Sequence, residues 1–125
     1  MDERNEMSKE REEIRGLTAS VVSMADEVGK FLREASRNFL ARDAGAIPRL
    51  QEKDGEIDRL ENANDARCLR ILALYQPAAD DLRTVFMALK INNDMERIGD
   101  HALNIAERAE ALGLATNELM DGRYD

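Results

Sequence analysis

Tryptophan is absent from this sequence, and aromatic residues together make up only 4% of its 125 residues. Because β-sandwiches and barrels draw on aromatic and β-branched residues for their strands, this scarcity argues against an all-β fold. The 43% hydrophobic and 35% charged residues suit long helices with charged outer faces. The length allows one elongated core between packed helices but not two, so we expect an all-α protein with a single domain over residues 1–125.

Cysteine, long apolar runs and excess positive charge are also scarce or missing. Cys68 is the only cysteine, which excludes an internal disulfide and fits a reducing compartment. No apolar run approaches the ~20 residues of a spanning helix, and the N-terminus is acidic rather than basic and then apolar. We therefore expect a cytoplasmic protein without direct membrane insertion. The formal charge of −8 disfavours nucleic acid as a partner and favours cations and basic partners.

Apolar residues recur at spacings of three and four along three segments. This pattern predicts helices at about residues 2–41, 47–75 and 78–112, with the core at about 8–113. The apolar face of the first helix contains Ile14, Leu17, Val21, Met24, Val28, Phe31, Ala35 and Phe39. The face of the second contains Leu50, Ile57, Leu60, Cys68, Ile71 and Tyr75, with Asn64 interrupting it. Short connections make neighbouring helices antiparallel, so we expect an up-down-up three-helix bundle.

Residues that begin and end helices lie between these segments. Gly45 is the expected left-handed cap after the first helix. Pro48 lies in the first turn of the second helix, where its missing N–H is not needed. Gln76 and Pro77 are expected to end that helix. Two tight connections therefore fit the up-down-up arrangement.

The third segment has the most regular spacing, and it is expected to end before Gly113, with a loose tail after about Leu114. Its predicted inward face contains Ala88, Ile91, Met95, Ile98, Ala102, Ile105, Ala109 and Leu112. Small residues on this helix would let its neighbours approach closely. Four apolar residues outside this face could form a surface that packs against a second copy of the chain: Leu82, Phe86, Leu89 and Leu103. We therefore expect a homodimer.

Two acidic motifs lie on the second and third helices, DGEID at 54–58 and ERIGD at 96–100. Each places two carboxylates one turn apart on one face of its helix. Each also contains a glycine, Gly55 or Gly99, although glycine in a helix interior costs about 1 kcal/mol relative to alanine. The glycines suggest that backbone access or space is needed there.

The two motifs are placed symmetrically about Pro77. Asp58 and Glu96 lie 19 residues on either side of it, and Asp54 and Asp100 lie 23 residues on either side. In an antiparallel hairpin with equal rise per residue, Asp58 should therefore be level with Glu96, and Asp54 with Asp100.

Four carboxylates in one patch repel one another unless they bind protons or cations. Oxygen-rich sites take hard or borderline metal ions such as iron, zinc, manganese, magnesium or calcium. The alternative is that these side chains are ordinary solvated surface. On the third helix they face away from the predicted apolar side, so we expect a surface patch rather than a cavity in the bundle core.

Other chemistry has little support in the sequence. His101 is the only histidine, and it projects about 100° around the helix from Asp100, so we expect a surface or packing residue rather than a ligand. Cys68 lies on an apolar helix face and is expected in the core. No Ser-His-Asp or Cys-His arrangement and no phosphate-cradling glycine loop is present, so an enzyme is not expected.

Longer runs around the acidic motifs resemble a known family. DGEIDRLE at 54–61, QPAADDLR at 76–83, ALKINNDMERIGDHA at 88–102 and NIAE at 104–107 look like the PhoU family of phosphate-uptake regulators. The resemblance covers about residues 17–112. It implies a single PhoU-like repeat, a three-helix bundle.

The resemblance also implies a site and a role. In the family such motifs bind multinuclear metal clusters, iron or zinc ahead of magnesium, manganese or calcium, and here the matching ligands are Asp54, Asp58, Glu96 and Asp100. Members act as cytoplasmic negative regulators that link a phosphate ABC transporter to a sensor histidine kinase, and they are not known as enzymes. Typical members contain two tandem repeats and this chain one, so a homodimer would restore the arrangement.

Two other functions stay open at this point. The chain could be a stand-alone metal-binding or adaptor domain of another ion-transport system. A metallohydrolase is the least supported, because the sequence shows no evident base or substrate cleft.

Overall fold

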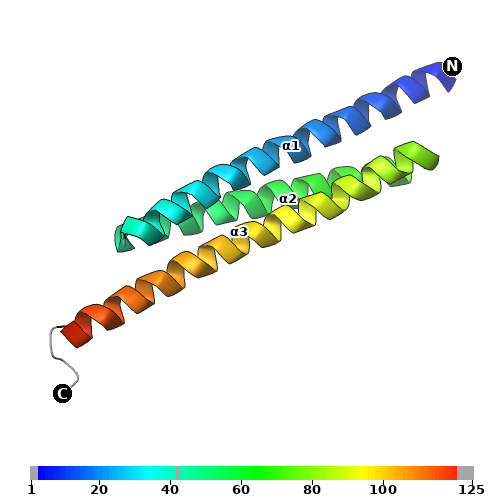
Figure 1. Cartoon of the computed structure of the whole chain (residues 1–125). Helices are drawn as coiled ribbons and strands as arrows, with labels where there is room; N and C mark the ends of the chain where they lie inside the picture. Colours follow the sequence, from blue (N-terminus) through cyan, green and yellow to red (C-terminus); the bar gives the residue numbers. More distant parts are fainter. Residues whose placement is uncertain (1–2, 42, 121–125) are drawn as a thin grey trace.

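Three long helices lie side by side in the computed structural model of this chain (Figure 1). The helices are α1 (Glu3–Ala41), α2 (Ile47–Tyr75) and α3 (Ala79–Met120), with a short 3-10 helix, η1 (Ala44–Ala46), between α1 and α2. Each long helix packs against both of the others, and the chain runs up, down and up. The all-α three-helix bundle predicted from the sequence is confirmed.

The structure describes residues 3–41 and 43–120, and side chains only as far as residue 113, without that of residue 44. The predicted helix start at residue 2 lies outside this range. None of the helices in the described part is long and apolar enough to cross a membrane.

Helix α2 begins and ends as predicted, with Pro48 in its first turn, whereas Gly45 and the end of α3 differ from the prediction. Gln76 adopts a left-handed conformation with φ 45° and donates its N–H to the Leu72 carbonyl at 3.3 Å, which ends α2 just before the buried Pro77. Gly45 is not a left-handed cap: it lies within η1, and its N–H donates to Asp43 Oδ1 at 3.0 Å. The predicted loose tail is wrong as far as Met120, because α3 continues through Gly113 to that residue, and the rest of the tail lies outside the described residues.

Two apolar clusters follow one another along the bundle. One contains Ile14, Leu17, Val21, Cys68, Ile71, Val85 and Ala88. The other contains Met24, Val28, Phe31, Ala35, Ile47, Leu50, Ile57, Ala102 and Ala106. The predicted face of α1 is therefore confirmed as far as Ala35, but Phe39 is half exposed and Asn38 is buried instead. The predicted burial of Cys68 is confirmed.

Between the two clusters, hydrogen-bonded polar side chains join all three helices. Ser20 Oγ donates to Asn64 Oδ1 at 2.7 Å, and Asn64 Nδ2 donates to Asn92 Oδ1 at 3.1 Å. Asn92 Nδ2 donates to the Glu61 carbonyl at 3.0 Å and to Asp65 Oδ1 at 2.9 Å. Because both asparagines are fully buried, sliding one helix would leave polar atoms unpaired, so this layer fixes the helix register.

The inward face of α3 differs from the predicted one. Ile91, Ile98 and Ile105 are 39%, 38% and 57% exposed. Within the part of α3 whose side chains are described, the buried residues are Val85, Ala88, Asn92, Gly99, Ala102 and Ala106. Most of these are small, and α3 packs against both α1 and α2, so the face with the small side chains allows the closer approach. The predicted face is therefore confirmed at Ala88 and Ala102. It is wrong at the three isoleucines, where the next residue along the chain is buried instead, which corresponds to a small rotation of the helix.

Candidate metal centre

Three carboxylates from two helices meet at the interface of α2 and α3. Asp54 and Asp58 come from α2 and Asp100 from α3, and one oxygen of each lies within 4.8 Å of the other two. We call these three residues and Glu96 the acidic cluster. All four are partly buried. The cluster is therefore partly buried at the helix interface. The sequence had suggested a patch on an open surface.

The different position follows from the rotation of α3. Gly99 is buried, which brings Glu96 and Asp100 to the edge of the packed face. A Cβ added at Gly99 would lie 3.7 Å from both Asp54 Oδ1 and Ile57. Asp54 Oδ1 therefore lies close to α3 at Gly99, at a distance that would also accommodate an alanine Cβ. Gly55 has a different surrounding, because only the Arg59 side chain comes near it.

Burial and charge act together on Asp54. Burial is the main cause that raises the pKa of Asp54 to about 6, and the charges of Asp100 and Asp58 add to it. Asp54 Oδ1 is buried and has no hydrogen-bond partner among the described residues. A buried carboxylate oxygen without a partner is costly, so this atom is well suited to accept a proton or a cation.

The pKa of Glu96 is raised by its neighbours in the cluster. A hydrogen bond shared with Asp100 is the main cause that raises the pKa of Glu96 to about 8, followed by burial and a hydrogen bond with Asp58. The contacts of Glu96 with Asp58, and of Asp54 with Asp100, are the pairs that the symmetry about Pro77 predicted. At neutral pH the cluster therefore retains protons that ordinary carboxyl groups would have lost.

Further carboxylates surround the cluster. Burial, followed by the charges of Asp65, Asp58 and Asp100, raises the pKa of Glu61, and the charge of Glu107 acts on Asp54. The sequence prediction did not include Glu61 or Asp65 in the site. Their spacing of three and seven residues from Asp58 places them on one side of α2, and this signal could have identified them.

The cluster fits a metal ion on three grounds. Its donors are all carboxylate oxygens, which suit hard and borderline cations. One oxygen each from Asp54, Asp58 and Asp100 lies within 4.8 Å of the other two, so small movements of these side chains would bring all three to the ~2.4 Å of a carboxylate-to-calcium bond. Asp54 Oδ1 is buried and accepts no hydrogen bond from a donor in the described part of the chain, so this oxygen is available as a ligand. Metal binding by Asp54, Asp58, Glu96 and Asp100 stays a prediction.

The remaining predicted residues lie outside the cluster. His101 follows Asp100 in sequence but is exposed. Cys68 is buried in an apolar cluster, and burial raises the pKa of its thiol. The arrangement is thus a carboxylate site without histidine or thiolate.

The fold and the site together define a class of protein, the helical bundles that have a carboxylate cluster between two of their helices. Residues 21–109 match the PhoU domain family. Because this match covers more than half of the chain, the chain belongs to the PhoU family.

Relatives of known name agree with this assignment. A phosphate-specific transport system accessory protein PhoU homolog of Pseudomonas putida is 38% identical over 104 residues, which are 83% of this chain and 40% of the relative. Homologs with the same name in Deinococcus radiodurans and Aquifex aeolicus are 35% and 40% identical over 82% and 71% of this chain. The chain spans 40% to 48% of the length of these three relatives.

Proposed function

We propose that this chain is a metal-binding regulatory protein of the phosphate system. It acts in the cytoplasm as a negative regulator between a phosphate ABC transporter and a sensor histidine kinase, and it binds partners rather than catalysing a reaction. Membership of the PhoU family and the names of the relatives support this role. The observation that carries the proposal is the acidic cluster with its unpaired Asp54 oxygen.

The residues of the cluster have distinct parts in this proposal. Asp54 and Asp58 offer oxygens from α2, and Glu96 and Asp100 offer oxygens from α3. A bound iron or zinc ion, or alternatively magnesium, manganese or calcium, would supply positive charge that neutralises these carboxylates. The same four residues then connect α2 to α3 and fix the surface that these helices present to a partner.

A genetic experiment tests the role. Deleting the gene should derepress phosphate-starvation genes in phosphate-rich medium, and the wild-type gene should restore repression. The Asp54→Ala/Glu96→Ala variant should fail to restore it. The matched control, Glu52→Ala/Asp94→Ala, removes one exposed carboxylate from each of the same helices and should restore it fully.

An unchanged phosphate response after deletion would remove the phosphate role. Intact metal binding in that case would favour the alternative, an adaptor domain of another ion-transport system. Full repression by the Asp54→Ala/Glu96→Ala variant would show that the cluster does not serve regulation.

We also propose that the chain acts as a homodimer. It spans less than half of the three relatives compared above, so a second copy would supply a comparable second bundle. Exposed apolar residues of α3 offer a surface for it: Leu82, Phe86, Met87, Ile91, Ile98 and Ile105. Leu89 and Leu103, which the sequence had suggested for this surface, pack against the core clusters instead.

Sedimentation tests the dimer directly. The wild type should sediment as a dimer at micromolar concentration, and Ile98→Lys/Ile105→Lys should sediment as a monomer. The control, Val22→Lys/Leu69→Lys, charges two exposed apolar residues of α1 and α2 and should remain a dimer. A monomeric wild type would contradict the proposal.

A further inference from the structure

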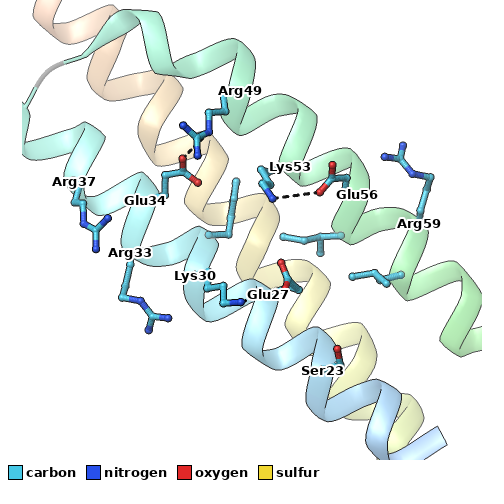
Figure 2. Close-up of a pocket in the computed structure, with 13 residues that line it drawn as sticks. Ser23, Glu27, Lys30, Arg33, Glu34, Arg37, Arg49, Lys53, Glu56 and Arg59 are labelled. Atoms are coloured by element: carbon cyan, nitrogen blue, oxygen red, sulfur yellow. Dashed lines mark ion pairs between the residues drawn. The ribbon is translucent and has the colours of Figure 1, made fainter. Parts of the chain in front are cut away.

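A groove of about 780 Å³ lies between α1 and α2, on a side of the bundle that α3 does not line (Figure 2). Its basic lining residues are Lys30, Arg33, Arg37, Arg49, Lys53 and Arg59, and its acidic ones are Glu27, Glu34 and Glu56. The groove therefore has an excess of positive charge in a chain whose net charge is −8. No residue of the acidic cluster lines it.

Each acidic residue of the groove is already paired with a groove cation. The pairs are Arg49–Glu34 at 2.9 Å, Lys53–Glu56 at 3.6 Å and Lys30–Glu27 at 3.6 Å. The Arg49–Glu34 pair joins α2 to α1 across the groove (Figure 2). The side chains of Arg33, Arg37 and Arg59 form no ion pair or hydrogen bond with any described residue. The excess charge of the groove is thus located on three unpaired, exposed arginines.

The three arginines stand on opposite sides of the groove. Arg33 and Arg37 project from α1, and Arg59 projects from α2 (Figure 2). Arg33 and Arg37 are one helical turn apart, a rise of about 6 Å. A helix lying along the groove would therefore have guanidinium groups on both flanks, as charged residues flank the apolar seam of a coiled coil.

The apolar residues that line the groove are mostly buried. Phe31 and Ile57 line the groove but are buried, and Leu60 is 38% exposed. An occupant would therefore gain a short apolar contact at Leu60 and most of its binding from charge. Guanidinium groups bind carboxylates with two parallel hydrogen bonds, which favours an acidic occupant.

We propose that this groove docks an acidic helical segment of a protein partner, with carboxylates on both of its flanks. A helix repeats its carboxylates one turn apart, at the spacing of Arg33 and Arg37. Nucleotides and nucleic acids fit less well, because no exposed aromatic ring lines the groove for a base to stack on. A single phosphate would contact only part of a cation array that spans about 15 Å of α2 between Arg49 and Arg59.

Fluorescence anisotropy with the full chain tests the proposal. The probe is a labelled helical peptide with glutamates one turn apart on both sides of a leucine strip, and its control has glutamine at the same positions. At an ionic strength of about 0.15 M, where long-range attraction is screened, only the glutamate peptide should bind. The Arg33→Glu/Arg37→Glu/Arg59→Glu variant should lower its affinity by about tenfold or more.

A matched variant separates local contacts from net charge. Lys90→Glu/Arg97→Glu/Arg108→Glu makes the same charge change on exposed residues of α3 and should leave the affinity within about twofold, because these residues lie outside the groove. Circular dichroism checks that both variants are helical. If the reversal of the three groove arginines disturbs folding, the Arg33→Gln/Arg37→Gln/Arg59→Gln variant replaces it and should weaken binding in the same direction.

Five results would overturn the proposal. The two peptides could bind equally, or the glutamate peptide could fail to bind. Both triple reversals could weaken binding to the same extent. Inorganic triphosphate could bind the same three arginines more tightly than the peptide, which would make the ligand a phosphate compound. The three groove substitutions could abolish self-association measured by sedimentation, which would make the occupant a second copy.

This inference does not depend on the proposed phosphate role, because the peptide measurement involves neither metal nor phosphate signalling. Failure of peptide binding would leave the genetic test of that role untouched.

Discussion

Replacing Asp100 by asparagine should stabilise the metal-free protein at pH 8. The substitution removes one charge from the acidic cluster and keeps a side-chain oxygen that can still accept the hydrogen bond from Glu96. The ligand oxygens of Asp100, Asp54 and Asp58 all lie within 4.8 Å of one another. At that separation two unit charges repel by about 0.9 kcal/mol in water and about 3.5 kcal/mol at an effective dielectric constant of about 20. Because the cluster is only partly buried, the lower value applies, and two pairs give about 1–2 kcal/mol.

The pH dependence gives the sign of the effect. The folded state raises the pKa of Asp54 to about 6 and that of Glu96 to about 8, so it retains protons that the unfolded chain has lost. The stability that these groups contribute is therefore fully present below about pH 4 and is lost as the pH rises through 6 and 8. Asp100→Asn should make this loss smaller, because fewer negative charges then oppose the ionisation of its neighbours.

Thermal unfolding of chelator-treated protein, followed by circular dichroism, measures this prediction. The Tm of Asp100→Asn at pH 8 should exceed that of the wild type by about 3–8 °C, with a smaller gain at pH 5. Asp94→Asn removes an exposed carboxylate of the same helix and should change the Tm by less than about 2 °C. A lower Tm at pH 8, or an equal gain at both pH values, would refute the reasoning.

Three further predictions concern the same interface. Gly99→Ala should raise the free energy of unfolding of the metal-free protein by about 1 kcal/mol in a urea titration, since a Cβ there meets its neighbours at an ordinary 3.7 Å; a loss of stability would contradict this. Asn92→Ala should lower the free energy of unfolding by about 2–3 kcal/mol, because it leaves the buried Asn64 amide without its Asn92 partner. The control Asn93→Ala changes an exposed residue and should leave the free energy of unfolding nearly the same. Zinc binding near pH 6.5 should release protons from Asp54 and Glu96. In calorimetry the heat of binding should then vary with the ionisation enthalpy of the buffer. A heat of binding that is independent of the buffer would argue against these ligands.

The sequence predicted the helices and the register of α2 against α3 because both follow from spacing. Apolar residues at intervals of three and four mark α1 from Ile14 to Ala35, and a tight turn at Pro77 fixes which residues of the hairpin are level. The face of α3 could not be read in the same way. Its isoleucines and its small residues have the same period, and only close packing against two helices selects the small ones.

The proximity of the four predicted carboxylates followed from the sequence, but their setting did not. The hairpin symmetry brought Asp54, Asp58, Glu96 and Asp100 together, but their partial burial depends on the rotation of α3 that places Gly99 against α2. The basic groove was not predictable from spacing within one helix. It arises only where outer residues of α1 and α2, far apart in sequence, become neighbours.

The central claim is that the acidic cluster binds metal, and the metal content of the purified protein tests it most directly. Metal analysis should find bound iron or zinc in the wild type and in the Glu52→Ala/Asp94→Ala control, and little in the Asp54→Ala/Glu96→Ala variant. Equal metal content in all three proteins, or none in the wild type after purification without chelator and exposure to either metal, would contradict the account.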